Sequence, residues 1–180
     1  VINLYNKLNL RKQLVIFQDH LNASLYSNNF YQKRGIDYAV ITNDITLDEI
    51  NEISKYNKLM IISYGYLPIF YSRRHLISNY LQYINKPKKN NKLYYIKNKD
   101  DKYPILEEAD GTTIYTKEAI NLINDVDDLN VDYLILNAFN IETDDFIAII
   151  NEYLKDKKTN RREYTGFLKK NTVYKVEDYE

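Results

Sequence analysis

Apolar residues in this chain gather in short uninterrupted runs, separated by polar and amphipathic segments. The runs of strand length are 14–17, 38–41, 59–62 and 133–136. Because apolar and polar residues do not alternate within them, we expect strands covered on both faces, as in a parallel sheet. Segments with helical spacing follow three of the runs, at 24–34, 46–53 and 143–153. This order of strand and helix predicts right-handed parallel crossovers.

The clearest local signal is a capping box at the start of the second helical segment. Thr46 is placed to accept a hydrogen bond from the first turn, and Glu49 to reach back to the backbone of Thr46. Leu47, Ile50 and Ile53 then form one apolar stripe at helical spacing. The sequence therefore predicts an amphipathic helix that begins at this box.

In the middle of the chain the order of strand followed by helix is interrupted. A short helix is predicted at 76–81, and three short β-like runs follow at 93–97, 103–106 and 113–115. The dipeptide Asp110-Gly111 is a strong hairpin signal between the last two runs. We expect an antiparallel β-hairpin insertion at 93–116, after which helical periodicity resumes at Ala119, Ile120 and Ile123.

About four β/α units are half of a TIM-type barrel, whereas a closed eightfold barrel needs about 200 residues or more. The 180 residues therefore form either an open α/β sheet or the back half of a barrel whose front half is missing. The absence of a starting Met favours the second arrangement. The predicted fold class is α/β, a partial TIM-type (β/α) barrel over 1–154 with the hairpin insertion. A basic loop and C-terminal extension are expected at 155–180.

The amino-acid composition excludes several classes of functional site. The chain has no Cys, which rules out disulfides, thiolate zinc sites, cysteine-ligated iron–sulfur clusters and a cysteine nucleophile. Twenty-five basic and twenty-five acidic residues give a formal net charge of zero, hence no global field that attracts nucleic acid or an anionic membrane. There is no phosphate loop, no HExxH and no nucleophile elbow. No apolar run approaches the roughly 18 residues of a membrane span, so we expect a cytoplasmic protein without a membrane partner.

Ligands meet the carboxyl ends of parallel strands, so the polar residues after each predicted strand are candidates. These are Gln18, Asp19, His20, Thr42, Asn43, Asp44, Ser63, Tyr64, Asn137 and Asn140. Each can instead be a loop residue that caps the next helix. Asp19 and His20 can pair as orienting carboxylate and base, or remain a solvated loop pair.

Basic residues cluster at three places. Arg73, Arg74 and His75 precede the predicted helix at 76–81, where the arginines suit a carboxylate or phosphate at the barrel mouth. The alternative is an ordinary surface ion pair with Glu107 or Glu108. The runs 86–92 and 155–162 are basic enough to touch an RNA backbone, but the zero net charge favours solvated loops.

The stretch 64–80 resembles the signature of the U32 peptidase family, the collagenase-like proteases. Gly65, Leu67, Ile77 and Ser78 fall at the matching places without a gap. Three other parts of the chain resemble further parts of that family in collinear order: 29–35 with 44–50, then 103–114, then 165–168. The resemblance covers almost the whole chain and corresponds to the C-terminal half of the family core.

The chain departs from that signature in its polar positions. Pro68 and His75 occupy the two signature Cys positions, Arg73 replaces a signature Gly, and Tyr64 stands where His is often found. In cysteine-bearing relatives these Cys belong to a set thought to bind an iron–sulfur cluster. The resemblance therefore implies no such cluster here, and no cofactor is expected.

The function that the resemblance implies is divided. Family members are named as peptidases, so the first expectation is a U32-family peptidase whose catalytic residues are unassigned. Other members look like accessory proteins for hydroxylating a wobble uridine in tRNA with the use of prephenate. The alternative is thus a non-proteolytic accessory protein that binds a small carboxylate such as prephenate, or a degenerate partner subunit.

The expected partners follow from these alternatives. They are a peptide or small carboxylate, tRNA, a U32-family paralogue, and the missing N-terminal half. The ligand-binding candidates are Arg73, Arg74, His75, Asp19, His20, Asn43 and Tyr64.

Overall fold

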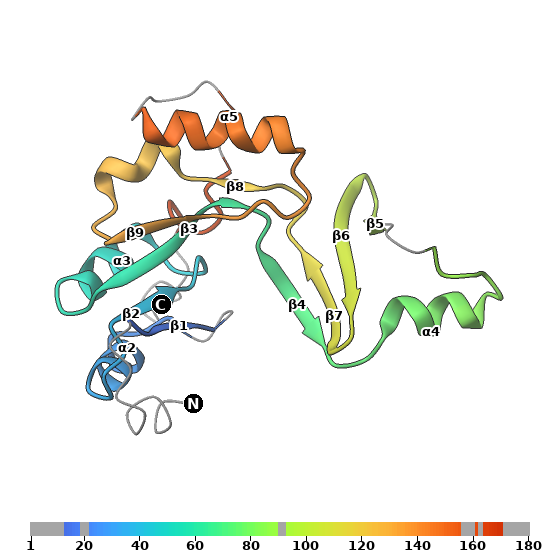
Figure 1. Cartoon of the computed structure of the whole chain (residues 1–180), viewed down its shortest axis with the longest axis horizontal. Helices are drawn as coiled ribbons and strands as arrows, with labels where there is room; N and C mark the ends of the chain where they lie inside the picture. The colour runs from blue at the N-terminus through green and yellow to red at the C-terminus, as the bar shows by residue number, and fades with distance from the viewer. Residues whose placement is uncertain (1–12, 19–21, 90–92, 156–160, 162–163, 171–180) are drawn as a thin grey trace, which may run out of the picture.

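A computed structural model of the chain describes residues 13–18, 22–89, 93–155, 161 and 164–170, and shows two sheets with helices around them (Figure 1). The first half contains β1 (Val15–Phe17), α2 (Leu25–Gln32), β2 (Tyr38–Ile41), α3 (Leu47–Ser54), β3 (Leu59–Gly65), β4 (Pro68–Ser72) and α4 (Leu76–Tyr83). The second half contains β5 (Tyr94–Asn98), β6 (Asp101–Glu108), β7 (Gly111–Tyr115), β8 (Ile120–Asn121), the 3₁₀ helix η1 (Ile123–Asp128), β9 (Tyr133–Leu136) and α5 (Thr143–Leu154).

The first sheet is parallel apart from one short strand. Strands β1, β2, β3 and β9 lie side by side in chain order and run in the same direction. Short β8 is antiparallel to β3 and pairs with Tyr64 and Gly65, beyond the end of β2. Within the described residues neither sheet closes into a barrel. The α/β class is confirmed, whereas the expected TIM-type barrel is not shown and the observed sheet is open.

The central strands carry the core. All four residues of β2 are buried, and Ile61 and Ile62 on opposite faces of β3 are both buried, so the expectation of two covered faces is confirmed there. It is wrong for β1, where Val15 and Phe17 are 43% and 59% exposed. The reason is position, because β1 is the edge of the sheet and pairs only with β2 among the described residues.

Helix α3 begins as its sequence predicts. The Thr46 hydroxyl accepts a hydrogen bond from the Glu49 amide at 3.3 Å, and the Glu49 carboxylate accepts one from the Thr46 amide at 2.8 Å. Ile50 and Ile53 are buried in the main core cluster, so the apolar stripe faces the sheet as expected. No helix in the described part of the chain combines the length and apolar character needed to cross a membrane.

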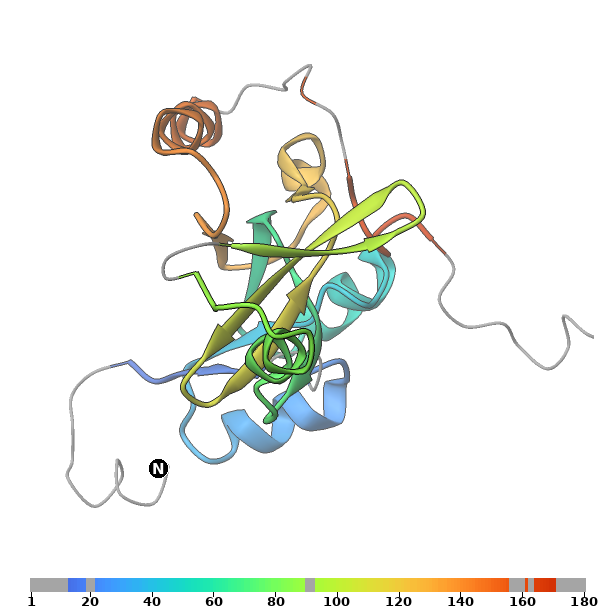
Figure 2. The same cartoon turned by 90° about the vertical axis from the view of Figure 1, so that its right-hand side faces the viewer.

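The second sheet is antiparallel, in the order β4-β7-β6-β5, and projects with α4 from one end of the parallel sheet (Figures 1 and 2). The predicted hairpin at Asp110-Gly111 is confirmed as the β6–β7 turn. Strand β4 was not expected, because its partner β7 lies some forty residues further along the chain. The helix expected near Ala119 is wrong: Ile120 pairs with Gly65, and the Leu122 amide donates to the Ser63 carbonyl at 2.9 Å.

A carboxylate joins α4 to the second sheet, alongside a hydrogen bond from the Leu76 amide to the Thr112 hydroxyl at 3.0 Å. Glu107 of β6 accepts hydrogen bonds from the amides of Ile77 and Ser78 at 2.7 and 3.0 Å, from the Ser78 hydroxyl, and from Lys88 at 2.7 Å. Its side chain is 2% exposed. Burial alone raises the pKa of Glu107, but the hydrogen bonds from Lys88 and from the side chain and backbone of Ser78 lower that pKa to about 2.

Replacement of Glu107 by Gln is expected to lower the free energy of unfolding at pH 7 by on the order of 3 kcal/mol, because the ionised carboxylate is preferred in the folded state. The lowered pKa means that this stabilisation is complete above the unfolded pKa of roughly 4.3 and is lost as the pH falls through about 2. Urea unfolding of wild type and Glu107→Gln between pH 7 and pH 2 measures the difference. The matched control is Glu108→Gln, an exposed neighbour. Parallel pH curves for wild type and Glu107→Gln would contradict the assignment.

Gly65 is the point at which the chain leaves the parallel sheet for the antiparallel one. Its φ is +125°, and a Cβ atom placed there would lie 2.6 Å from the Asn137 carbonyl oxygen and 2.7 Å from the Asn137 Cβ. The Asn137 amide in turn donates to the Tyr64 carbonyl at 2.8 Å. Only glycine fits between β3 and the segment that follows β9.

Gly65→Ala should therefore cost about 3 kcal/mol of unfolding free energy, from the positive φ and from the clash with Asn137 together. Gly166→Ala is the control, because Gly166 also has a positive φ, of 58°, but its added Cβ would meet no atom closer than 3.7 Å. We expect the control to lose about 1 kcal/mol in the same urea titration. Equal losses in the two variants would show that the close approach to Asn137 is unimportant.

Candidate functional site

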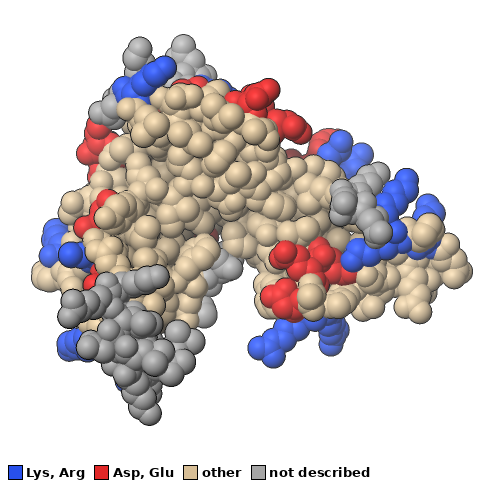
Figure 3. Space-filling model, viewed as in Figure 1, with Lys and Arg blue, Asp and Glu red and all other residues tan. Residues whose placement is uncertain are grey.

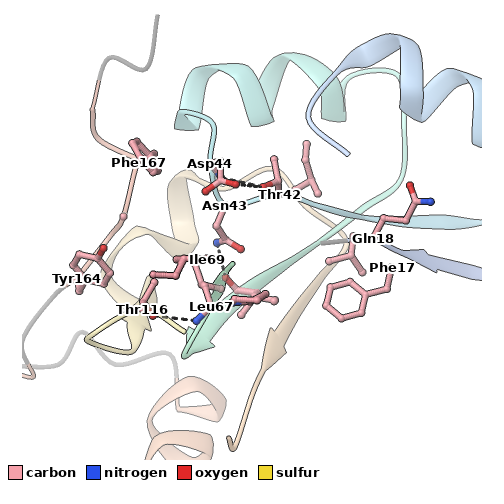
Figure 4. A pocket seen from close by; sticks show the side chains of 15 residues that line it. Phe17, Gln18, Thr42, Asn43, Asp44, Leu67, Ile69, Thr116, Tyr164 and Phe167 are labelled. Atoms are coloured by element: carbon pink, nitrogen blue, oxygen red, sulfur yellow. Dashed lines mark hydrogen bonds between the residues drawn. The ribbon is translucent and has the colours of Figure 1, made fainter. Parts of the chain in front are cut away.

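A pocket lies where the strands of the parallel sheet end. Residues from the carboxyl ends of β1, β2 and β3, from the start of β4 and from the segment 164–167 surround it (Figure 4). Its empty volume is about 610 Å³, part of which is open to solvent. The lining residues are Phe17, Gln18, Val40, Ile41, Thr42, Asn43, Asp44, Ile62, Leu67, Pro68, Ile69, Thr116, Tyr164, Gly166 and Phe167.

Short hydrogen-bonded turns hold the polar groups of this pocket. The Asn43 side-chain amide donates to the Ile62 carbonyl at 2.9 Å, which fixes the amide against β3. The Thr42 hydroxyl donates to the Asp44 carboxylate at 3.0 Å, directly after β2 (Figure 4). The polar side chains at the end of β2 are thus held in place by the fold.

A segment near the end of the chain closes one side. The Asn121 amide donates to the Tyr164 carbonyl, and the Leu47 amide donates to the Leu168 carbonyl, both at 3.0 Å. These bonds bring the rings of Tyr164 and Phe167 to the pocket, across from Phe17 (Figure 4). The result is a mostly apolar pocket with aromatic rings on two sides.

The chemistry of the lining is that of a neutral binding site. Among the described lining residues Asp44 is the one that carries a charge, and none of them is Lys, Arg or His. Among the described residues, no group of three or more His, Cys, Asp or Glu could hold a metal ion. Amide and hydroxyl groups next to aromatic rings suit a flat, uncharged ligand that both donates and accepts hydrogen bonds.

Ser63, another residue expected near the strand ends, is completely buried within β3. Its hydroxyl donates to the Tyr153 hydroxyl at 2.8 Å, and the Tyr153 hydroxyl donates to the Ser63 carbonyl at 2.9 Å. Burial raises the pKa of Tyr153 to about 12, although the Ser63 hydrogen bond lowers it in part. The two hydrogen bonds join α5 to β3.

One of the five ligand candidates that the structure describes lies in the pocket. Asn43 lines the pocket, together with its neighbours Thr42 and Asp44 and with Gln18. Tyr64 does not; burial raises its pKa, and the nearby Arg161 charge partly offsets that effect. Asp19 and His20 lie outside the described residues, so their pairing stays a prediction.

The three basic candidates lie elsewhere. Arg73, Arg74 and His75 form the exposed corner between β4 and α4 and are not among the described residues that line the pocket. The buried Thr112 hydroxyl holds this corner by donating to the Arg74 carbonyl at 2.7 Å. The alternative ion pair with Glu107 is not observed, because Glu107 binds Lys88. A ligand-binding role for these residues stays a prediction.

Sequence reasoning missed the aromatic walls of the pocket. Phe17, Tyr164 and Phe167 come from opposite ends of the chain, and Thr116 follows β7. The one available signal was the family resemblance of 165–168, which includes Gly166 and Phe167 but does not indicate where this segment lies in the fold. A positive φ at Gly166 lets the segment turn over the strand ends.

Comparisons with known proteins place the chain. The family model described as Peptidase family U32 matches residues 1–174. A curated relative from Bacillus subtilis (strain 168), named tRNA hydroxylation protein P2, is 29% identical over 116 residues. That alignment covers 59% of this chain and 38% of the relative, so the chain spans about two fifths of the relative's length. No solved structure matches significantly. The match to the family model over nearly the whole chain shows that this protein belongs to peptidase family U32.

Proposed function

We propose that this protein is an accessory factor for the hydroxylation of a uridine in tRNA. The observation that carries the proposal is the pocket at the strand ends, which is lined by amides, hydroxyls and aromatic rings and by no cation or metal-binding group among the described residues. The relative named tRNA hydroxylation protein P2 supports the same function. We place the activity in the cytoplasm, where tRNA is modified.

A uracil base matches the chemistry of this pocket. Uracil is flat and uncharged, with one N–H donor between two carbonyl acceptors, and the amides of Asn43 and Gln18 offer both kinds of group. Proteins that take a base out of a nucleic acid hold it by stacking on aromatic rings and by hydrogen bonds to its Watson–Crick edge. Phe17 and Phe167 supply rings at the rim, 59% and 45% exposed. The wobble uridine of an unpaired anticodon loop is the proposed occupant.

A small dicarboxylate such as prephenate does not suit the same pocket. The described lining holds no cation, and Asp44 would repel a carboxylate. Arg73 and Arg74 are both exposed at the β4–α4 corner and remain the proposed place for such a ligand. We propose that this chain binds the RNA and the base. The proposal assigns no redox step to its residues.

The test is genetic complementation with a chemical readout. Deletion of the gene should remove hydroxylated uridine from tRNA, as measured by mass spectrometry of tRNA nucleosides in a strain without a U32 paralogue. A Phe17→Ala/Phe167→Ala variant should restore less than a tenth of the modification, because a stacked base loses about 1–3 kcal/mol per aromatic ring removed. Both rings are exposed, so the fold should be kept.

The matched control is Tyr26→Ala/Tyr56→Ala, which removes two exposed rings that do not line the pocket and should restore modification fully. Normal modification in the deletion strain would contradict the proposal.

Peptidase activity is the second candidate, because the chain belongs to a family named for it. Purified protein should leave gelatin and unstructured peptides intact if the first proposal is correct. Cleavage that Arg73→Ala/Arg74→Ala abolishes would favour the peptidase instead.

A further inference from the structure

The neutral net charge of the chain hides a strong separation of charge. Residues 86–102 contain seven Lys and two Asp, a net charge of +5 within 17 residues, so the rest of the chain carries −5. In the structure this segment runs from the end of α4 through β5 to the start of β6. Figure 3 shows blue side chains gathered on the part of the molecule that projects away from the parallel sheet.

The cations of this segment are largely free of carboxylates. Lys88 pairs with Glu107. The other described lysines of the segment are exposed and make no ion pair with another described residue: Lys86, Lys89, Lys97, Lys99 and Lys102. We call these five residues the basic patch. Asp101 does not neutralise the patch, because its carboxylate is bound by Lys117 at 3.1 Å.

Two members of the basic patch face each other. Lys97 of β5 and Lys102 of β6 are direct cross-strand partners in the antiparallel hairpin. Side chains at such positions lie with their Cβ atoms roughly 5 Å apart, and like charges there are destabilising. The hairpin therefore holds two ammonium groups together at a cost to folding, which a bound anion would relieve.

The surroundings favour RNA over a membrane. Helix α4, next to the patch, buries Ile77 and exposes Tyr80 and Tyr83, which are 62% and 85% exposed. A helix that lies on a membrane needs an exposed apolar face, and the exposed side of α4 is made of Asn, Gln and Tyr. Exposed tyrosines beside lysines are instead typical of surfaces on which bases stack and phosphates pair.

We propose that the basic patch binds the phosphodiester backbone of an RNA, with Lys97 and Lys102 holding one phosphate between them. The choice of tRNA as the RNA rests on the proposed function. On the same face of the hairpin, Tyr95 donates to the Asn140 side chain at 3.2 Å, which ties this face to the loop after β9 at the carboxyl ends of the strands. In this proposal, RNA bound on the basic patch extends toward the carboxyl ends of the strands in the parallel sheet.

The test is equilibrium binding of an unmodified tRNA transcript to the full chain at several salt concentrations. Lys97→Gln/Lys102→Gln should weaken binding at low salt and reduce the slope of log K against log[salt] by roughly 0.7, the value for one lost phosphate contact on a single strand. Its melting temperature should be unchanged or higher, because the variant removes a like-charge pair. Loss of binding therefore cannot be ascribed to misfolding.

The control is Lys33→Gln/Lys58→Gln, which removes two exposed charges, one at the end of α2 and one directly before β3. It should bind tRNA as the wild type does. An equal loss in both variants would overturn the proposal, as would preferential binding of phosphatidylglycerol vesicles over tRNA.

The result is separable from that of the proposed function. If deletion leaves tRNA modification normal while the patch variant loses tRNA binding, the patch proposal stands and the modification proposal fails. If deletion removes the modification while the patch variant binds tRNA normally and restores it, the modification proposal stands and the patch proposal fails.

Discussion

Strand β3 is the element on which the rest of the structure depends. It pairs with β2, β8 and β9, and both of its faces are buried. At its carboxyl end, Gly65 lies so close to Asn137 that no side chain fits, and the chain turns there from a parallel sheet into an antiparallel one. Because the two sheets are joined at this glycine, the second sheet grows from the same end of the parallel sheet at which ligands bind.

The pocket is a consequence of that junction. Leu67 and Ile69 enter it directly after the turn, beside the ends of β1 and β2, and Tyr164 and Phe167 cover one side. Its lining reflects what a parallel sheet exposes at its strand ends, namely amides and hydroxyls that the next helices do not use. Amide and hydroxyl groups can hold a ligand by donating and accepting hydrogen bonds.

Charged residues are unevenly distributed over the second sheet and α4. The Glu107 carboxylate fixes α4 to the second sheet and binds Lys88, while the five lysines of the basic patch are exposed. A formal net charge of zero suggested the absence of an attractive field, but fields act locally over about a Debye length of 8 Å at physiological salt. A concentrated +5 segment is therefore felt by a nearby phosphate regardless of distant carboxylates.

Much of the fold could be predicted from interactions between residues that are close in sequence. The capping box at Thr46, the hairpin at Asp110-Gly111 and the continuous apolar run at 38–41 each specify a structure through neighbours in sequence, and each is observed. Elements whose partners are distant were missed or misread. Strand β4 exists because β7 pairs with it, and Ile120 is drawn into β8 by Gly65 in spite of its helical spacing.

The same distinction between local and distant interactions applies to the candidate site. The sequence by itself determined that polar residues such as Asn43 end the strands, that no thiol chemistry is present, and that the chain resembles the U32 family. Only the tertiary structure decided that Phe17 and Phe167 face one pocket while Arg73 and Arg74 do not. The physical reason is that strand ends are set by local pattern, whereas pocket walls are set by contacts between residues up to 150 positions apart.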